Sequence, residues 1–209
     1  MNVNQSRNGL GRQPAVGDPD RIESLLAGLA DRAVGEGLLD VGYGTVDSPL
    51  GRLLVAATSA GVVRVGFKSD SEAHLLGELA RRVSARLLRA PRLVDDARGQ
   101  LAEYFDGRRR QFEVSLDWRL SAGFRRRVLR ATALIPYGET GTYREVATAA
   151  GRPRAVRAAG GALAATPLPI IVPCHRVLRS DGTLGGYRGG PERKARLLAL
   201  EAGGRDVRA

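Results

Sequence analysis

The spacing of hydrophobic residues changes twice along this chain and divides it into three parts. Apolar residues recur every three or four positions over residues 21–34, which predicts a short amphipathic helix. Residues 1–20 are polar and rich in Gly, Asn and Gln, and we expect them to be disordered. Together with the link to the next part, they form a predicted N-terminal extension over residues 1–40.

From Val41 the hydrophobic period shortens to that of β-strands. Strands are predicted over residues 41–46, 52–58 and 62–67, with tight turns between them, as an antiparallel meander. Two helices, over residues 72–88 and 93–105, and a short strand over 111–116 follow. These elements predict an α/β domain over residues 41–120.

Residues 121–209 predict a second, mostly helical domain, with helices over 124–135, 142–150, 153–164 and 191–201. Thr142 and Glu145 have the spacing of a capping box at the start of the second of these helices. Gly151 ends that helix, and Pro153 suits the first turn of the next. Two short helices joined by a turn that contains glycine are typical of a helix-turn-helix.

The second helix of this pair contains Gly160 and Gly161, each of which costs about 1 kcal/mol of helix stability relative to alanine. Two explanations are open. The glycines could allow close packing against another helix. Alternatively, the helix could lie close to a nucleic-acid backbone, with Arg157 as the one long side chain that inserts between bases.

The net charge of +11 is concentrated in the C-terminal part of the chain. Residues 1–120 contain 17 basic and 16 acidic side chains, whereas residues 121–209 contain 16 basic and only 6 acidic ones. The preference for Arg over Lys is typical of a GC-rich genome, but it does not explain the loss of acidic residues. This asymmetry favours a polyanionic partner, most simply nucleic acid.

The sequence excludes several classes of protein. No apolar run approaches the roughly 20 residues that span a membrane, and the N-terminus lacks the apolar segment of a signal peptide. One cysteine and two histidines cannot supply a structural zinc site, and no Walker-type loop is present. We therefore predict a cytoplasmic protein with no membrane partner and no metal site. We also expect a monomer without a cofactor.

Cys174, the only cysteine, follows the apolar run 170–172 and precedes His175 and Arg176. It is either an inert packed group or a nucleophile, and its neighbours favour the second, because positive charge promotes the reactive thiolate. Glu201, at the end of the last helix, is the best candidate for a carboxylate partner. Side chains of adjacent residues diverge if the backbone is extended, so we expect a water to bridge Cys174 and His175.

Several motifs in this order resemble the O6-alkylguanine-DNA alkyltransferase family, the methylated-DNA–protein-cysteine methyltransferases. They are Ile135-Pro136-Tyr137-Gly138-Glu139-Thr140, Tyr143, Arg157-Ala158-x-Gly160-Gly161-Ala162, Pro173-Cys174-His175-Arg176, Gly185-Gly186-Tyr187-x-Gly189-Gly190 and Lys194-x-x-Leu197-Leu198-x-x-Glu201. The resemblance is strong over residues 120–201, weaker over 41–116 and absent over 1–40. It implies an α+β protein in which a small ribonuclease H-like domain precedes a winged helix-turn-helix-like domain.

The resemblance also implies an activity: irreversible transfer of an alkyl group from O6-alkylguanine, or less efficiently O4-alkylthymine, in duplex DNA to Cys174. The base must be flipped out of the helix to react. Because a thioether has no partner thiol to resolve it, each molecule is consumed by one lesion. No cofactor is implied.

Individual roles follow from the same resemblance. His175 deprotonates Cys174 through a water, Glu201 orients His175, and Tyr143 helps to rotate the nucleotide and assists the leaving guanine. The residues expected to contact DNA are Tyr143, Arg157, Ala158, Gly160 and Arg176. Those expected to line the pocket are Leu163, Thr166, Val177, Tyr187 and Arg188, with the carbonyls of Cys174 and Val177 reading the guanine amine.

Two positions depart from the family pattern. Thr166 stands where the family usually has an asparagine that ties the helix-turn-helix to the active-site segment, and its single hydroxyl cannot make the same set of hydrogen bonds. Arg188 stands where a small residue is common. Thr166 motivates a second hypothesis, a protein that recognises lesions but transfers poorly. A third hypothesis is a cysteine hydrolase that uses Cys174 and His175.

Overall fold

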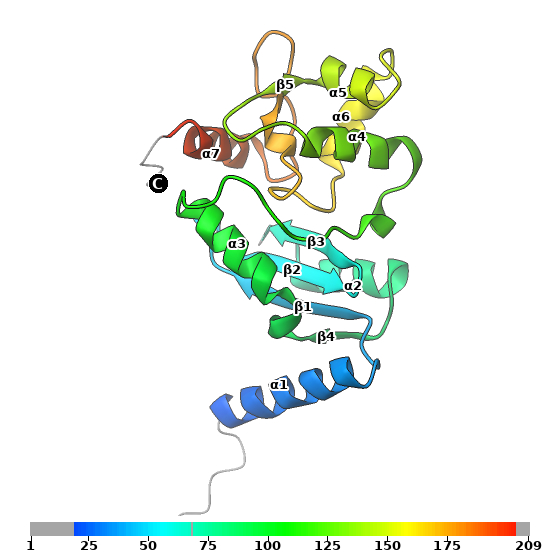
Figure 1. The fold of residues 1–209 in the computed structure, drawn as a ribbon, viewed down its shortest axis with the longest axis vertical. Helices are drawn as coiled ribbons and strands as arrows, with labels where there is room; N and C mark the ends of the chain where they lie inside the picture. The colour runs from blue at the N-terminus through cyan, green and yellow to red at the C-terminus, as the bar shows by residue number, and fades with distance from the viewer. Residues whose placement is uncertain (1–18, 68, 204–209) are drawn as a thin grey trace, which may run out of the picture.

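The computed structural model describes residues 19–67 and 69–203 (Figure 1). The disorder expected for residues 1–20 falls outside this range, apart from Pro19 and Asp20, which begin helix α1 (Pro19–Gly35). Within the described ranges, no helix has both the length and the apolar composition needed to cross a membrane.

A four-stranded sheet forms the centre of the N-terminal half (Figure 1). The three predicted strands are confirmed as β1 (Val41–Val46), β2 (Leu53–Thr58) and β3 (Gly61–Phe67), which pair in antiparallel fashion. A fourth strand, β4 (Leu87–Arg89), pairs parallel to β1, which gives the order β3-β2-β1-β4. The sheet is therefore mixed rather than a simple meander.

The helix predicted over residues 72–88 is wrong beyond Arg82. Helix α2 covers Glu72–Arg82, and the chain then turns into β4. The Ser84 hydroxyl donates to Asp40 and accepts the backbone N–H of Arg86, which forms a turn that competes with further helix. The free edge of β1 then offers backbone partners to residues 87–89.

Helix α3 (Asp95–Phe105) follows a 3₁₀ turn, η1 (Pro91–Val94), and closely matches the prediction. The strand predicted over residues 111–116 is wrong, because only Leu116 makes a single bridge, to Val62. Backbone groups in this segment bond to scattered partners instead; the N–H of Glu113, for example, donates to the Gln100 side chain.

The C-terminal half is mostly helical. Its elements are η2 (Trp118–Leu120), α4 (Gly123–Ala133), β5 (Gly141–Thr142), α5 (Tyr143–Ala149), α6 (Val156–Ala164), η3 (Cys174–Arg176), β6 (Val177–Leu178) and α7 (Pro191–Glu201). The capping box of Thr142 and Glu145 is confirmed. Pro153 lies in the turn before α6 rather than in its first turn, because residues 152–155 form a hydrogen-bonded turn of their own.

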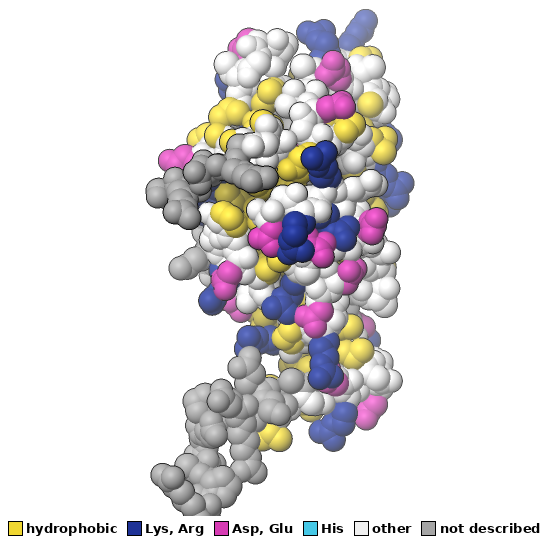
Figure 2. Space-filling model, turned by 60° about the vertical axis from the view of Figure 1, so that its left-hand side comes forward, with side chains coloured by type: hydrophobic (Ala, Val, Ile, Leu, Met, Phe, Trp, Pro, Cys, Tyr) yellow, Lys and Arg dark blue, Asp and Glu magenta, His cyan; other side chains and the backbone are white. Residues whose placement is uncertain are grey.

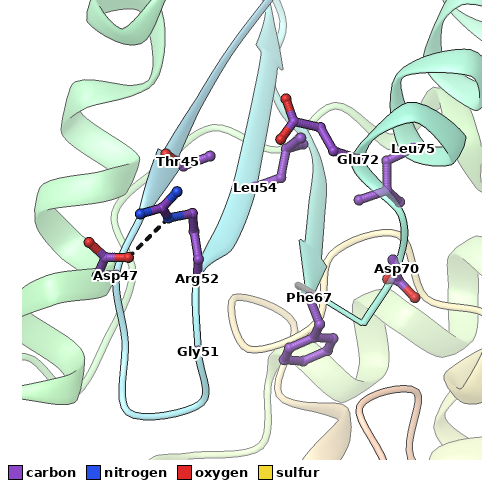
Figure 3. A pocket seen from close by; sticks show the side chains of 9 residues that line it. All are labelled: Thr45, Asp47, Gly51, Arg52, Leu54, Phe67, Asp70, Glu72 and Leu75. Atoms are coloured by element: carbon purple, nitrogen blue, oxygen red, sulfur yellow. Dashed lines mark hydrogen bonds and ion pairs between the residues drawn. The ribbon is translucent and has the colours of Figure 1, made fainter.

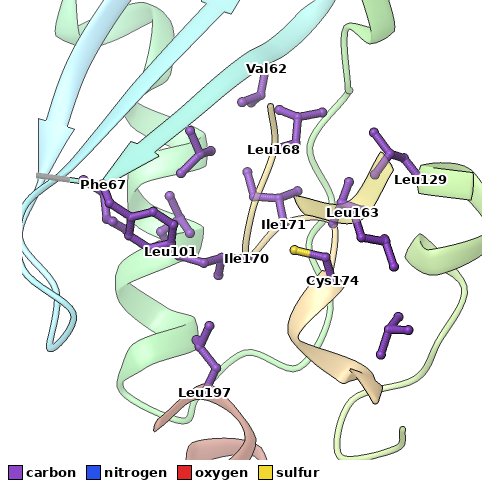
Figure 4. Close-up of a cluster of buried hydrophobic side chains, with 14 of the residues drawn as sticks. Val62, Phe67, Leu101, Leu129, Leu163, Leu168, Ile170, Ile171, Cys174 and Leu197 are labelled. Atoms are coloured by element: carbon purple, nitrogen blue, oxygen red, sulfur yellow. The ribbon is translucent and has the colours of Figure 1, made fainter. Parts of the chain in front are cut away.

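One hydrophobic core is shared by the two halves (Figure 4). It includes Leu53, Val55, Val65, Phe67, Leu101, Tyr104, Val128, Leu129, Leu163, Leu168, Ile170, Val172, Cys174 and Leu197. The outer edge of β3 also bonds to both the connecting segment and the C-terminal half: Val62 bonds Ser115 and Asp117, and the N–H of Val65 donates to the carbonyl of Pro167. The sheet therefore supports the C-terminal half directly.

Helix α1 lies beside β4, away from the C-terminal half (Figure 1). Ala30 is buried, and Asp31 pairs with Arg92 at 2.5 Å. Ile22, Leu25, Leu26 and Leu29, in the preceding turns of the helix, are exposed. Figure 2 shows hydrophobic side chains on the surface at this end of the molecule. The predicted amphipathic helix is therefore confirmed, with part of its apolar stripe exposed.

We predict that Gly61→Ala destabilises the protein by at least about 2 kcal/mol. Gly61 begins β3 with φ of 125°, and a Cβ there would lie 2.2 Å from the carbonyl oxygen of Ser115. Urea unfolding of the purified variant measures the change in the free energy of unfolding.

Gly99→Ala is the matched control. Gly99 lies on the exposed side of α3, and a Cβ there meets nothing within 4 Å. This variant should gain about 0.5–1 kcal/mol, because alanine is the better helix former. A Gly61→Ala variant as stable as the wild type would contradict the close backbone contact between the start of β3 and Ser115.

Candidate active site

Cys174 begins the short 3₁₀ helix η3, and its side chain is packed in the shared core with only 3% of its surface exposed (Figure 4). The backbone here is not extended, in contrast to the arrangement considered from the sequence. The thiol is therefore held inside the protein, in reach only of groups that enter the core or its rim.

The segment that leads to Cys174 is unusually constrained. Ile170 has a positive φ of 75°, which costs a β-branched residue on the order of 1–3 kcal/mol. Its side chain is fully buried, and the N–H of Val172 donates to the carbonyl of Leu168 across a tight turn. Thr166 is also buried, and its hydroxyl accepts the N–H of Leu168 at 3.2 Å. Packing thus holds the backbone that presents the thiol.

Glu201, at the end of α7, is a buried carboxylate that accepts five hydrogen bonds. Its Oε1 accepts from Tyr104 (2.7 Å), from His175 Nε2 (2.8 Å) and from Arg176 Nη2 (2.9 Å). Its Oε2 accepts from Arg176 Nε (2.8 Å) and from the backbone N–H of Gly138 (3.2 Å). Burial raises the pKa of this carboxyl, but hydrogen bonds from His175, Arg176 and Tyr104 outweigh burial and lower it to about 2.

His175 is completely buried, and burial lowers its pKa despite the opposing effect of Glu201. The imidazole is therefore neutral at pH 7. Since Nε2 faces the Glu201 carboxylate, we assign the proton to Nε2. The other nitrogen, Nδ1, accepts no hydrogen bond from the described residues, which leaves its lone pair free to act as a base.

Burial also raises the pKa of the Cys174 thiol to about 12, although Lys194 and Arg188 oppose the shift. This corrects the expectation that neighbouring charge makes a thiolate. His175 is neutral, and the Arg176 charge is paired with Glu201. The resting site holds a protonated thiol that needs a base.

Arg176 does not lie on the surface, as its assignment to DNA contact requires. The side chain is buried, pairs with Glu201 and donates to the carbonyl of Ile135 at 2.5 Å. Its guanidinium also lies over the ring of Tyr137, 5.8 Å from the centroid. This placement contradicts the expected role in DNA contact and makes Arg176 a structural partner of the carboxylate.

Two residues of the site were missed from the sequence. Tyr104, on α3 in the N-terminal half, reaches Glu201 through its hydroxyl. Lys194, on α7, is fully buried and donates to the carbonyls of Val177 and Leu184; burial lowers its pKa to about 8. Lys194 stands in one of the motifs that resemble the family, so the sequence could have indicated it. Tyr104 could not be found in this way, because only the tertiary fold brings it to Glu201.

The pocket residues expected from the sequence differ in burial: Leu163, Thr166 and Val177 are buried, whereas Tyr187 and Arg188 are partly exposed. Leu163 is buried in the same core cluster. The carbonyl of Val177 accepts from Lys194 at 2.5 Å, and that of Cys174 accepts the N–H of Val177. Both carbonyls expected to read a base thus already accept one hydrogen bond, and each keeps a second lone pair.

The glycine-rich segment 185–190, the active-site loop, lies between Tyr143 and the N-terminal half. The hydroxyl of Tyr143 donates to the carbonyl of Gly186 at 3.3 Å. Burial raises the pKa of Tyr143, so the phenol stays protonated and can donate. The ring of Tyr187 stands edge-on to His175, with centroids 6.4 Å apart, so this loop carries a wall of the site.

Helix α6 exposes a surface of small residues on which Arg157 is the long side chain. Arg157, Ala158 and Gly161 are exposed. A Cβ on Gly161 meets nothing within 4 Å, and one on Gly160 meets only the Tyr143 ring at an ordinary 3.8 Å. Close packing against another helix therefore does not explain the two glycines, and the alternative, an external partner, is favoured.

Two family models match this chain. The ribonuclease-like domain of 6-O-methylguanine DNA methyltransferase matches residues 41–118, and the DNA-binding domain of the same family matches residues 123–203. With the mixed sheet and helices described above, these matches confirm the expected α+β fold class. Residues 1–40 lie outside both models.

Individual proteins are similar over the same part of the chain. A methylated-DNA–protein-cysteine methyltransferase of Mycolicibacterium paratuberculosis is 41% identical over 76% of this chain and 91% of the relative. One from Methanosarcina barkeri is 38% identical over 76% of this chain and 96% of the relative. The structure of Mycobacterium tuberculosis OGT in complex with DNA has a TM-score of 0.68 and 38% identity, covering 78% of this chain and 93% of that one.

We predict that Glu201→Gln lowers the free energy of unfolding at pH 7 by about 3–5 kcal/mol, because it leaves the buried Arg176 without its counter-ion. A carboxyl with a lowered pKa stabilises the fold above the ordinary pKa, and this contribution disappears as the pH falls toward the folded value. The wild type should therefore lose about 3 kcal/mol more than the variant between pH 5 and pH 2.

Urea unfolding at a series of pH values measures both effects. Glu192→Gln, an exposed position on the first turn of the same helix, is the control and should change stability by less than about 0.5 kcal/mol. Equal acid sensitivity of Glu201→Gln and the wild type would exclude Glu201 as the group responsible.

Proposed function

Since this chain belongs to the 6-O-methylguanine DNA methyltransferase family, we propose that Cys174 is the alkyl acceptor of a direct-reversal DNA repair reaction. The chain is a DNA-binding transferase that moves an alkyl group from DNA to a cysteine. Cys174 is its only cysteine, and this observation carries the assignment.

The proposed substrate is a guanine alkylated on O6 in duplex DNA, with O4-alkylthymine as a poorer one. The buried thiol supports this proposal, because a stacked base cannot bring its O6 substituent into the core of a protein. The nucleotide has to rotate out of the helix and enter between Tyr143 and the active-site loop. Unstacking costs a few kcal/mol, which contacts to the DNA backbone offset.

Proton removal is assigned to His175. Nε2–H is held by Glu201, so Nδ1 is the available base, and a water bridging Nδ1 and the sulfur carries the thiol proton. The Glu201 carboxylate stabilises the imidazolium that forms. A thiol with a raised pKa becomes nucleophilic only while this relay operates, which limits side reactions in the resting protein.

In the transfer itself, the sulfur forms a bond to the alkyl carbon while the bond from that carbon to O6 breaks. The electron pair passes to the guanine, which accepts a proton, and the net result is that the thiol proton is exchanged for the alkyl group. Tyr143 supports the leaving base as a hydrogen-bond donor. The product is a thioether without a partner thiol, so each molecule reacts once.

Contact with DNA is assigned to the exposed surface of α6. Its small residues Ala158 and Gly161 allow close approach to a minor groove, and Arg157 can fill the space left by the flipped base. The remaining basic side chains of the C-terminal half supply attraction to phosphates.

We further propose a monomer that acts in the cytoplasm, where a reducing environment keeps a lone thiol reactive. Two domains, over residues 41–120 and 121–209, would then suffice for repair. The extension over residues 1–40 lies outside the matched family models and is proposed to be dispensable for the chemistry.

We predict that the protein gains the mass of one alkyl group on Cys174 after incubation with a duplex that contains O6-methylguanine. Intact-protein mass spectrometry and peptide mapping measure the adduct, and Cys174→Ala is the matched control. A lesion-free duplex should give no adduct.

The same experiment separates the competing functions. Tight, lesion-specific binding without an adduct would select the recognition protein suggested by Thr166. Multiple turnover on an ester or peptide would select a cysteine hydrolase. Either result overturns alkyl transfer to Cys174.

We predict that Arg157→Ala slows transfer from duplex DNA at least about tenfold, because nothing then fills the stack behind the flipped base. Transfer from the free base O6-methylguanine, which needs no flipping, should change less than about twofold. Single-turnover rates with both substrates provide the comparison.

Arg52→Ala is the control for loss of one positive charge, since Arg52 is exposed on the N-terminal half and pairs with Asp47. It should leave both rates unchanged. Equal slowing of both substrates by Arg157→Ala would contradict a role in base flipping.

A further inference from the structure

The active-site loop, residues 185–190, is packed tightly from two sides. A Cβ on Gly185 would lie 2.6 Å from the hydroxyl oxygen of Tyr143. On the other side, a Cβ on Gly189 would lie 3.0 Å from the ring of Phe67, at the end of β3. The ring of Phe67 also stands edge-on to that of Tyr187, with centroids 6.0 Å apart. The loop therefore has little room to move without displacing a neighbour.

An ion pair ties the same loop to the N-terminal half. Arg188 Nε lies 3.4 Å from Asp70 Oδ2, in the segment between β3 and α2, and only about one fifth of either side chain is exposed. Arg188 is also the position at which the chain departs from the small residue common in the resembled family. The pair joins residues 118 positions apart and has no counterpart if residue 188 is small.

Arg193 strengthens the same contact from the first turns of α7. Its guanidinium donates to the carbonyls of Gly189 (2.8 Å) and Leu50 (3.2 Å) and reaches the Ser69 hydroxyl at 3.4 Å. It also lies over the Phe67 ring, 5.1 Å from the centroid. Phe67, Ser69 and Asp70 are therefore held against the active-site loop, and Asp70 supplies the negative charge.

Behind Phe67 and Asp70 the protein is open. A cavity of about 390 Å³ lies on the α2 side of the sheet, and both residues line it together with Thr45, Asp47, Gly51, Arg52, Leu54, Glu72 and Leu75 (Figure 3). The cavity leaves room on this side for the side chains of Phe67 and Asp70 if the ion pair with the loop is broken. Movement of the active-site loop away from the N-terminal half is blocked by Tyr143, which lies against Gly185.

We propose that Asp70 is a positioning residue that determines specificity: through Arg188 it holds the active-site loop near Tyr143 and so limits the size of the alkyl group that reaches Cys174. This inference rests on the proposed function. A methyl group fits with the loop in place, whereas a bulky group requires the loop to move toward the N-terminal half. Loss of the tie lowers the cost of that movement.

An electrostatic effect of Arg188 on the thiol is the main alternative, because this guanidinium opposes the rise in the pKa of Cys174. The two effects differ in their dependence on the substrate. A change in thiol ionisation alters the rates for all alkyl groups by the same factor. A change in the room available to the alkyl group alters their ratio.

The test compares single-turnover transfer to Cys174 from duplexes that contain O6-methylguanine or O6-benzylguanine. Asp70→Asn should raise the benzyl-to-methyl rate ratio at least about fivefold while the methyl rate changes less than about threefold. Asp47→Asn is the matched control: it lines the same cavity and loses an ion pair, with Arg52, but does not touch the loop. Its ratio should equal that of the wild type.

A charge exchange provides the second arm. Asp70→Arg and Arg188→Asp should each raise the ratio, and the double variant should return it toward the wild-type value because the pair is re-formed with reversed polarity. Thermal unfolding of each variant shows whether it is folded. If one single variant does not fold, the rate ratio of the double variant still tests the proposal.

Two failures are distinguishable. If the wild type gains no methyl group on Cys174, the proposed function itself is wrong. If the wild type reacts but Asp70→Asn leaves the ratio unchanged, or the exchanged pair does not restore it, the role of Asp70 is overturned and the proposed function stands.

Discussion

The structure depends on one buried carboxylate, Glu201, and on the donors that surround it. An isolated carboxylate in a protein core is strongly unfavourable, and this one is tolerated because five hydrogen bonds, two of them from the Arg176 guanidinium, offset its desolvation. The donors come from separate segments: Tyr104 from α3, Gly138 from the loop after α4, and His175 with Arg176 from η3. Their convergence makes Glu201 the point at which the N-terminal half, the loop and the active-site turn are joined.

This arrangement explains why the resting site holds a protonated thiol. Arg176 stands beside the nucleophile in sequence, but its charge is paired with Glu201 and does little for the thiol. Burial keeps His175 neutral and the Cys174 thiol protonated. Transfer therefore requires a base that removes the thiol proton, because the resting site holds no thiolate. In a protein that is consumed by one reaction, a protonated thiol has the advantage that it reacts slowly with other electrophiles.

The sequence predicted those features that depend on local pattern. Three of the four strands of the sheet and the capping box of Thr142 and Glu145 follow from period and spacing alone, and the residues around Cys174 already pointed to His175 and Glu201 as its partners. The predictions that were wrong concern features that depend on tertiary contacts. The apolar period continues past Arg82, but the free edge of β1 competes for residues 87–89. Arg176 was assigned to DNA contact, and no local pattern shows that it pairs instead with a buried carboxylate 25 residues later.

The two glycines of α6 connect stability to function most directly. Each costs about 1 kcal/mol of helix stability relative to alanine. At Gly161, no packing inside the protein offsets this loss. Alanine would fit there without contact, so the folded protein alone gives no reason for glycine. A reason exists only if the exposed side of the helix meets a surface that leaves no space for a methyl group. A minor groove is such a surface, and the helix that bears these glycines also exposes Arg157 and packs Gly160 against Tyr143. On the proposed function, the two glycines lower the stability of the helix assigned to DNA contact, whereas the hydrogen bonds around Glu201 stabilise the buried site.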